Sequence, residues 1–276
     1  MSLLQAVVYG IVQGLSEFLP ISSTAHLRIV PALLGWPDPG AAYTAIIQLG
    51  TTAAVVLYFA KDIGRVAKAW LAGLAHRKPL ESFDSRMGWY VIAGTVPVVV
   101  LGLLLRKRIE GEFRSLYVIA WAAIGMAILL ALAEKLARHR RPLESVTMKD
   151  AVGVGLAQAV ALIPGASRSG STLTGGLFLG LKRDAAARFS FLLSIPATVA
   201  AGLFELRHAF EAHQAGEALT AGPLLVGTVV SFVLGLGAIA WLLRFLRTRS
   251  TAIFIVYRLL LGAALLVLLS QGIVKT

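Results

Sequence analysis

The chain of 276 residues has no cysteine, and only 14% of its residues are charged. The absence of cysteine excludes disulfides, thiolate metal sites and a cysteine nucleophile. Soluble domains carry about 25% charged residues. The low charge therefore indicates a protein that is not surrounded by water on all sides, and this fits a hydrophobic content of 57%.

Acidic residues are especially scarce, and the formal net charge is +12. Such an excess of positive charge also occurs in nucleic-acid-binding proteins. Here, however, the lysines and arginines cluster at the ends of long apolar runs, which is the distribution that sets membrane topology. We therefore expect membrane lipids around this protein and no nucleic acid.

Apolar runs of about 20 residues, the length that crosses a bilayer, recur along the chain. Two further regions, 3–35 and 151–181, are apolar but interrupted by polar residues, so that each half is too short to span. Broken backbone at membrane depth is tolerated only where protein or a wet cavity satisfies it. The pattern predicts an all-α polytopic membrane protein with two re-entrant helix pairs and six transmembrane helices, at 41–60, 87–105, 116–134, 186–206, 222–243 and 252–273.

The two interrupted regions resemble each other, which indicates an internal repeat. Repeat 1 covers approximately 1–134 and repeat 2 approximately 148–273, within one membrane domain of residues 1–276. The similar segments follow the same order in both repeats: Gly-Ile-Val-Gln at 10–13 with Gly-Leu-Ala-Gln at 155–158, and 43–50 with 189–196.

The basic residues predict the orientation of this repeat. Most of them lie in four connecting segments that we assign to the cytoplasm: 61–86, 135–149, 182–188 and 244–249. This assignment places both termini outside, and the basic residues at 106–108 are an exception to it. The two re-entrant pairs then enter from opposite sides as an inverted-topology repeat, and their breaks meet near the midplane.

The first break contains Glu17, the one acidic residue before Asp38. A carboxylate in an apolar segment is expensive unless it is paired or functional. Gln13 lies four residues earlier, on the same helical face, so the two are candidates to hold a cation or orient a water. The alternative is a polar pair satisfied by neighbouring helices.

Three hydroxyl residues, Ser22, Ser23 and Thr24, follow a proline and precede another apolar helix. Such residues cap helix starts, and a capped start with free N–H groups also suits a phosphate. His26 lies one turn further on. It is either structural or a base or nucleophile beside Glu17.

The second break is a stronger anion signal. Arg168 offers a permanently charged fork that matches phosphate oxygens, and glycines allow close approach of the backbone. An arginine at this depth needs an anionic partner, and Glu17 is the candidate in the resting state. The alternative is a purely structural Glu17–Arg168 pair. The other candidate substrate-binding residues here are Gly165, Ser167, Ser169, Gly170 and Thr172.

Some further polar residues lie within the apolar runs. Arg258, in the last run, is explained by snorkelling of its long side chain towards the inner surface. Gln48 and Thr51 flank Gly50 and are interpreted as helix-packing groups. We expect none of these residues to contact the substrate directly.

These motifs resemble those of the bacterial undecaprenyl-diphosphatases of the bacitracin-resistance protein family. The first motif is carried by Gln13, Glu17, Phe18-Leu19-Pro20, Ser22-Ser23-Thr24 and His26, and the second by Pro164-Gly165, Ser167-Arg168-Ser169-Gly170 and Thr172. The resemblance implies a hydrolase of the bacterial inner membrane that converts undecaprenyl diphosphate into undecaprenyl phosphate and phosphate. It also implies recycling of the cell-wall lipid carrier, bacitracin resistance and dependence on a divalent cation.

The expected catalytic residues are Glu17, Ser23, His26 and Arg168. Arg168 would clamp the terminal phosphate, while Glu17 with Gln13 would hold Mg²⁺ or Ca²⁺ together with the substrate diphosphate, unless Glu17 is a base. The nucleophile is Ser23, His26 or a water. The site is expected to open to the outer face. A lipid flippase is the competing class, and the oligomeric state, a homodimer included, stays open.

Overall fold

The computed structural model describes residues 1–105, 108–109, 113, 115–214 and 221–274, without the side chains of 41 and 204–214. Arg106 and Lys107, two of the basic residues at 106–108 that are an exception to the predicted orientation, lie outside these residues. The described elements are the helices α1 (Leu3–Ser16), α2 (Ser23–Leu34), α3 (Gly40–Tyr58), α4 (Ala60–Ala75), α5 (Phe83–Leu104), α7 (Leu116–Leu136), α8 (Met148–Val160), α9 (Arg168–Phe178), α10 (Arg183–Gln214), α11 (Ala221–Thr248) and α12 (Ala252–Ser270), with a short 3₁₀ turn at Leu143–Ser145.

Among the described residues, five helices, α5, α7, α10, α11 and α12, are long and apolar enough to cross a membrane. Helices α3 and α4 pass the same criterion together, as a pair bent by 67°. The regular secondary structure of the described residues is therefore helical, and the protein is a multi-pass membrane protein. Each of the six ranges expected to span holds a helix.

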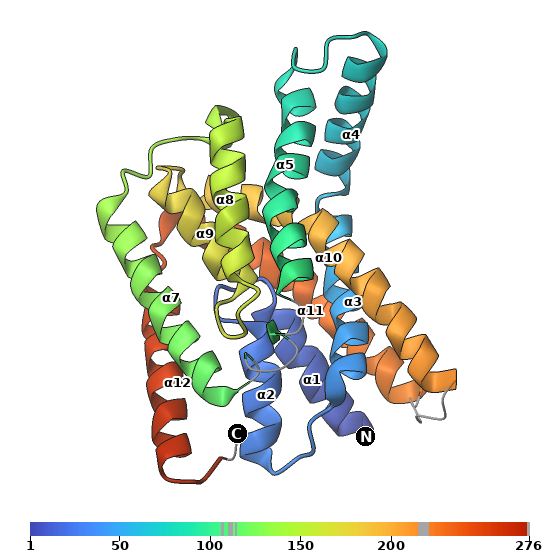
Figure 1. Cartoon of the computed structure of the whole chain (residues 1–276), viewed down its shortest axis with the longest axis vertical. Coiled ribbons are helices and arrows are strands. Elements are labelled where there is room, and N and C mark those ends of the chain that lie inside the picture. Colours follow the sequence, from blue (N-terminus) through green and yellow to red (C-terminus); the bar gives the residue numbers. More distant parts are fainter. Residues whose placement is uncertain (106–107, 110–112, 114, 215–220, 275–276) are drawn as a thin grey trace.

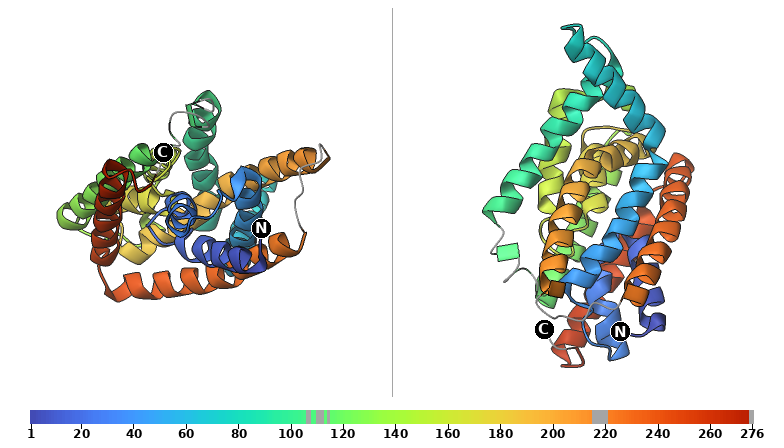
Figure 2. Two further views of the ribbon diagram at one scale, coloured as in Figure 1. Left: turned by 90° about the horizontal axis from the view of Figure 1, so that it is seen from below. Right: turned by 90° about the vertical axis from the view of Figure 1, so that its right-hand side faces the viewer.

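Helix α4 was not expected, because its residues were interpreted as part of a basic connector. The segment lacks proline and is rich in alanine, the best helix former, with leucines and lysines that also favour a helix. Together with the start of α5 it projects beyond the other helices (Figures 1 and 2).

The two interrupted regions form helix–break–helix units with the same backbone geometry. Helix α1 is followed by α2, and α8 by α9, each after a loop with a proline. The second helix of each unit is capped by a serine with positive φ, Ser22 at 75° and Ser167 at 70°. Non-glycine residues rarely adopt this conformation, so its occurrence at both breaks is a specific similarity between the two units.

The packing of the helices is reciprocal between the two halves of the chain. Helix α1 packs against α11 and α8 against α5, while α3 packs against α11 and α10 against α5. Helices α7 and α12 lie side by side (Figure 1). The interlocked halves bring the two breaks into contact in the interior, where Ser169 Oγ donates to the carbonyl oxygen of Leu19 at 2.9 Å.

Arg258 connects both breaks, and the expectation that it snorkels to the surface is wrong. Its side chain is fully buried. The guanidinium donates to the carbonyl oxygens of Pro20 at 3.2 Å, Gly165 at 3.0 Å and Ala166 at 2.9 Å, and Nε donates to Ala123 at 3.3 Å. Loop carbonyls without a helical partner need such donors in an apolar interior, and this arginine reaches the carbonyls of both loops.

The two ends of the helix bundle contain different parts of the chain. Helix α1 begins and α12 ends at one end, and the α4–α5 connection lies at the other (Figure 1). Arg141 and Asp150, just before and within the first turn of α8, form an ion pair at 2.6 Å. The connections that contain two of the basic segments, 61–86 and 135–149, lie at the end of the bundle opposite the start of α1 (Figure 1).

Candidate active site

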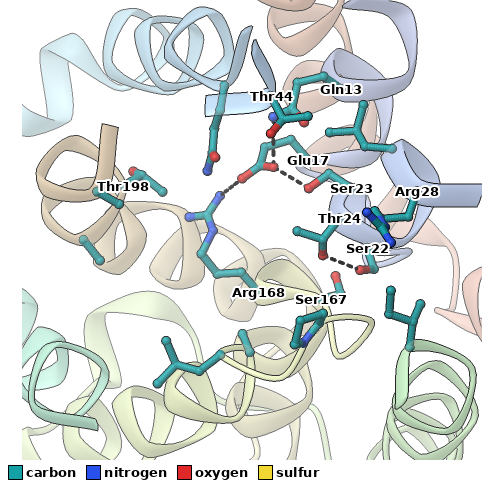
Figure 3. A pocket seen from close by; sticks show the side chains of 18 of the residues that line it. Gln13, Glu17, Ser22, Ser23, Thr24, Arg28, Thr44, Ser167, Arg168 and Thr198 are labelled. Atoms are coloured by element: carbon teal, nitrogen blue, oxygen red, sulfur yellow. Dashed lines mark hydrogen bonds and ion pairs between the residues drawn. The ribbon is translucent and has the colours of Figure 1, made fainter. Parts of the chain in front are cut away.

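Glu17 is the centre of the site. Its Oε2 accepts hydrogen bonds from Ser23 Oγ at 2.6 Å and from Gln13 Nε2 at 3.1 Å. Its Oε1 faces Arg168 Nη2 at 3.0 Å, so the expected pair between the two breaks is formed. Figure 3 shows the carboxylate between Ser23 and Arg168. Glu17 is only 8% exposed, and these donors compensate the cost of burying its charge.

Gln13 is held by a residue that the sequence did not indicate. Its Nε2 also donates to Thr51 Oγ1 at 3.1 Å, and Thr51 in turn donates to the carbonyl oxygen of Gln48. Both Gln48 and Thr51 were interpreted as packing groups, but Thr51 supports Gln13 and Gln48 lines the cavity described next. Their spacing on α3 gave no signal because threonine and glutamine are common in membrane helices.

A cavity of about 340 Å³ adjoins this cluster. Its size is at the lower end of the range for small-molecule sites. The lining combines the charged cluster with apolar groups of three long helices. Its members include Gln13, Glu17, Ser22, Ser23, Thr24, Arg28, Asp38, Gln48, Val98, Ile119, Gln158, Leu162, Ser167, Arg168, Ala197 and Thr198.

The remaining candidates of the first break lie in two directions. Ser22 Oγ and Thr24 Oγ1 lie 3.1 Å apart at the cavity. His26 does not line the cavity. Its Nδ1 lies 2.7 Å from the Ser22 carbonyl oxygen, and its Nε2 lies 2.5 Å from the hydroxyl of Tyr257 on α12. Both ring nitrogens are thus engaged away from Glu17.

The candidates of the second break divide in the same way. Ser167 and Arg168 line the cavity, whereas Ser169 and Thr172 point into the protein. Thr172 Oγ1 donates to the Arg168 carbonyl oxygen at 2.8 Å and contacts Ser190 on α10. A substrate role for Ser169 and Thr172 stays a prediction, but in this structure they support the loop that carries Arg168.

The two glycines of the second break have a structural reason to be glycine. A Cβ at Gly165, which has φ +92°, would lie 2.4 Å from the backbone oxygen of Ile119. A Cβ at Gly170 would lie 2.6 Å from Nη1 of Arg258. Both close approaches are to protein atoms, while approach of the backbone to a ligand stays a prediction.

The donor set around Glu17 restricts how a cation binds. Within the described part of the chain, no group of three or more His, Cys, Asp or Glu residues is placed to hold a metal. The carboxylate oxygens of Glu17 and the amide oxygen of Gln13 suit a hard cation such as Mg²⁺, but Arg168 already occupies Oε1 of Glu17. These residues therefore fit a divalent cation only when a ligand in the cavity supplies further oxygens.

Comparison with known proteins decides the family. Residues 6–264 match the family described as Bacitracin resistance protein BacA. The chain belongs to this family. It is 60% identical to the undecaprenyl-diphosphatase of Myxococcus xanthus over 99% of this chain and 91% of that protein. It is 56% identical to the undecaprenyl-diphosphatase of Chloroherpeton thalassium over 99% of this chain and 98% of that protein. It is 51% identical to the undecaprenyl-diphosphatase of a Nocardioides species over 98% of both chains.

Proposed function

We propose that this protein hydrolyses undecaprenyl diphosphate to undecaprenyl phosphate and inorganic phosphate, and so recycles the lipid carrier of cell-wall synthesis and confers bacitracin resistance. The observation that carries the proposal is the Glu17–Ser23–Arg168 cluster at the cavity. It combines a base, a hydroxyl and a cation, which are the groups that phosphoryl transfer requires. The similarity to relatives named undecaprenyl-diphosphatase supports the choice of substrate.

Ser23 is the proposed nucleophile. Its hydroxyl donates to Glu17 Oε2 at 2.6 Å, so the carboxylate can take the proton as the Ser23 oxygen attacks the terminal phosphorus. The new Oγ–P bond forms while the bond from phosphorus to the bridging oxygen breaks, and undecaprenyl phosphate leaves with the electron pair. A water then cleaves the phosphoserine, which releases phosphate and restores the hydroxyl. Alternatively, Ser23 and Glu17 orient a water that attacks directly.

Arg168 is the proposed electrostatic catalyst. Its side chain is 17% exposed at the cavity, and its guanidinium is paired with Glu17. A diphosphate that enters the cavity competes for this guanidinium, which frees Oε1 of Glu17. Arg168 then neutralises the charge on the transferred phosphoryl oxygens. The resting pair therefore holds both catalytic groups in place before the substrate arrives.

His26 is the less favoured nucleophile. Neither ring nitrogen of His26 contacts the carboxylate of Glu17. Nδ1 contacts the Ser22 carbonyl oxygen, and Nε2 contacts the Tyr257 hydroxyl. The contact with Ser22 places His26 directly behind the capped start of α2. We assign it to positioning of this loop.

A divalent cation, Mg²⁺ or Ca²⁺, is proposed to enter together with the substrate. Glu17 and Gln13 would hold it with oxygens of the diphosphate, because one carboxylate is insufficient alone. The cation would supply neutralisation of phosphate charge. Arg168 and the capped helix starts perform the same task from the protein side.

We propose that each of the two interlocked halves contributes three membrane spans and one re-entrant helix pair. Six helices span, and the α1–α2 and α8–α9 pairs are re-entrant from opposite sides as an inverted repeat. The equal cap geometry of Ser22 and Ser167 and the reciprocal packing of helices support this arrangement. The basic segments then face the cytoplasm, and the cavity opens to the outer face of the inner membrane. Association of two copies as a homodimer is tested by crosslinking in native membranes.

The same architecture favours one other candidate, a lipid flippase, since interrupted helices that meet in the interior are typical of transporters. Phosphate release from farnesyl diphosphate by the purified protein in detergent separates the two, because detergent holds no gradient. Activity in the wild type that is lost in Glu17→Ala and Arg168→Ala supports the hydrolase. A folded, inactive wild type would refute it.

A further inference from the structure

The cavity contains one polar side chain that the proposed chemistry leaves unused. Gln158, near the end of α8, lines the cavity and is only 1% exposed. Neither its Oε1 nor its Nε2 has a hydrogen-bond partner. Of the side chains that line the cavity in the described part of the chain, it is the one whose buried polar atoms both lack a partner. Such buried groups are rare in native proteins and call for a missing ligand or water.

Comparison with Gln13 shows why Gln158 is unpaired. The two glutamines occupy equivalent places in the aligned segments 10–13 and 155–158. Gln13 donates to Glu17, four residues later, and to Thr51 on α3. In the second half of the chain the corresponding positions are Leu162 and Ala197, which line the cavity and offer no side-chain acceptor.

We infer that Gln158 is a substrate-binding residue, which donates from Nε2 to a phosphate oxygen of the diphosphate when the cavity is occupied. The inference rests on the proposed function for its substrate. A phosphate is the suitable partner because the same cavity contains Arg168 and the Ser167-capped start of α9, both of which favour an anion. An amide adds donors without a further charge, which suits a site that must also release phosphate.

A second buried polar side chain without a hydrogen-bond partner provides a matched control. Ser171, on α9, is also 1% exposed, and its Oγ also lacks a hydrogen-bond partner. It is not among the residues that line the cavity. Removing either polar group should leave the melting temperature of the free protein unchanged or raised, because an unpaired buried group is lost. The two sites should differ only in their effect on ligand binding.

The experiment compares the wild type with Gln158→Met, Gln158→Glu and Ser171→Ala in detergent. Each is measured for melting temperature, for the thermal shift caused by inorganic pyrophosphate, and for KM and kcat with farnesyl diphosphate. We expect Gln158→Met to keep its melting temperature, lose most of the pyrophosphate shift and raise KM about 10-fold, the size of one hydrogen bond to a charged group. Gln158→Glu should raise KM further, because its carboxylate repels phosphate, and Ser171→Ala should match the wild type in both binding measurements.

A wild-type KM and pyrophosphate shift in Gln158→Met would overturn the inference. So would a lower melting temperature in both Gln158 variants with an unchanged KM, because that result assigns Gln158 to the fold. Failure of the proposed function is distinguishable, since the wild type would then bind pyrophosphate without releasing phosphate from farnesyl diphosphate. A wild type with no pyrophosphate shift would refute a phosphate ligand for Gln158.

Discussion

Arg168 Nη2 lies 3.0 Å from Glu17 Oε1, although the two residues are 151 positions apart in the chain. The pair joins the break after α1 to the break before α9. Each partner compensates the buried charge of the other. Each is also a group that a bound diphosphate would affect, because the diphosphate competes with Glu17 for Arg168. This double role means that substitutions of the pair affect folding and chemistry differently, which the following predictions use.

Arg168→Lys should lose most activity although the charge is kept. A lysine cannot make the planar two-pronged contact with phosphate oxygens. By analogy with the loss of one transition-state donor, kcat/KM should fall about 10²- to 10³-fold. The rate of phosphate release from farnesyl diphosphate measures this loss of kcat/KM. Arg65→Lys, at an exposed ion pair on α4, is the control and should behave like the wild type, while near-normal turnover of Arg168→Lys would reduce Arg168 to a general counter-charge.

Glu17→Gln should abolish activity while the protein still folds, because the amide oxygen can still accept from Arg168, whose side chain is 17% exposed at the cavity. If Glu17 holds the cation, raising the Mg²⁺ concentration should restore part of the rate. If it is a general base, added Mg²⁺ should restore nothing. Full activity in this variant would contradict both roles.

Ser23→Ala and His26→Asn should differ strongly in effect. Ser23→Ala removes the proposed nucleophile and should reduce kcat to background. His26→Asn removes a ring that contacts Ser22 and Tyr257, so it should reduce kcat by less than Ser23→Ala does. The opposite order, or a phosphohistidine detected after mixing with substrate, would make His26 the nucleophile.

Gly170→Ala should destabilise the protein. The added Cβ would lie 2.6 Å from Nη1 of Arg258, so the guanidinium must shift away from the carbonyls of both breaks. Overpacking of this kind costs about 1–3 kcal/mol. Gly237→Ala on α11, where a Cβ meets no atom within 4 Å, should leave the melting temperature unchanged or raise it. Equal melting temperatures of the two variants would show that the Arg258 contact tolerates displacement.

The orientation is testable directly because the chain has no cysteine. Single-cysteine variants His76→Cys, at the end of α4, and Gln271→Cys, after α12, should label differently with an impermeant maleimide. Position 271 should label in intact cells and position 76 only after permeabilisation. The reverse pattern would invert the assignment and place the cavity opening on the cytoplasmic side.

The sequence by itself determined the class of the protein, the approximate places of its long helices and the position of both breaks. These features depend on local patterns: apolar length, the prolines at 20 and 164, and hydroxyl residues before each second helix. It also indicated the charged residues of the site, since Glu17 and Arg168 are conspicuous in apolar surroundings. The sequence did not predict helix α4, because its basic residues are typical of a connecting segment between spans.

Only the tertiary structure decided which residues meet. The rotation of each helix in the bundle turned His26 towards Tyr257 and brought Thr51 to Gln13. It also buried Arg258 between the two breaks, where a local rule predicted snorkelling. Such contacts join segments far apart in the chain, and no periodicity records them, because an apolar environment satisfies each polar group with whichever partner the fold brings within reach.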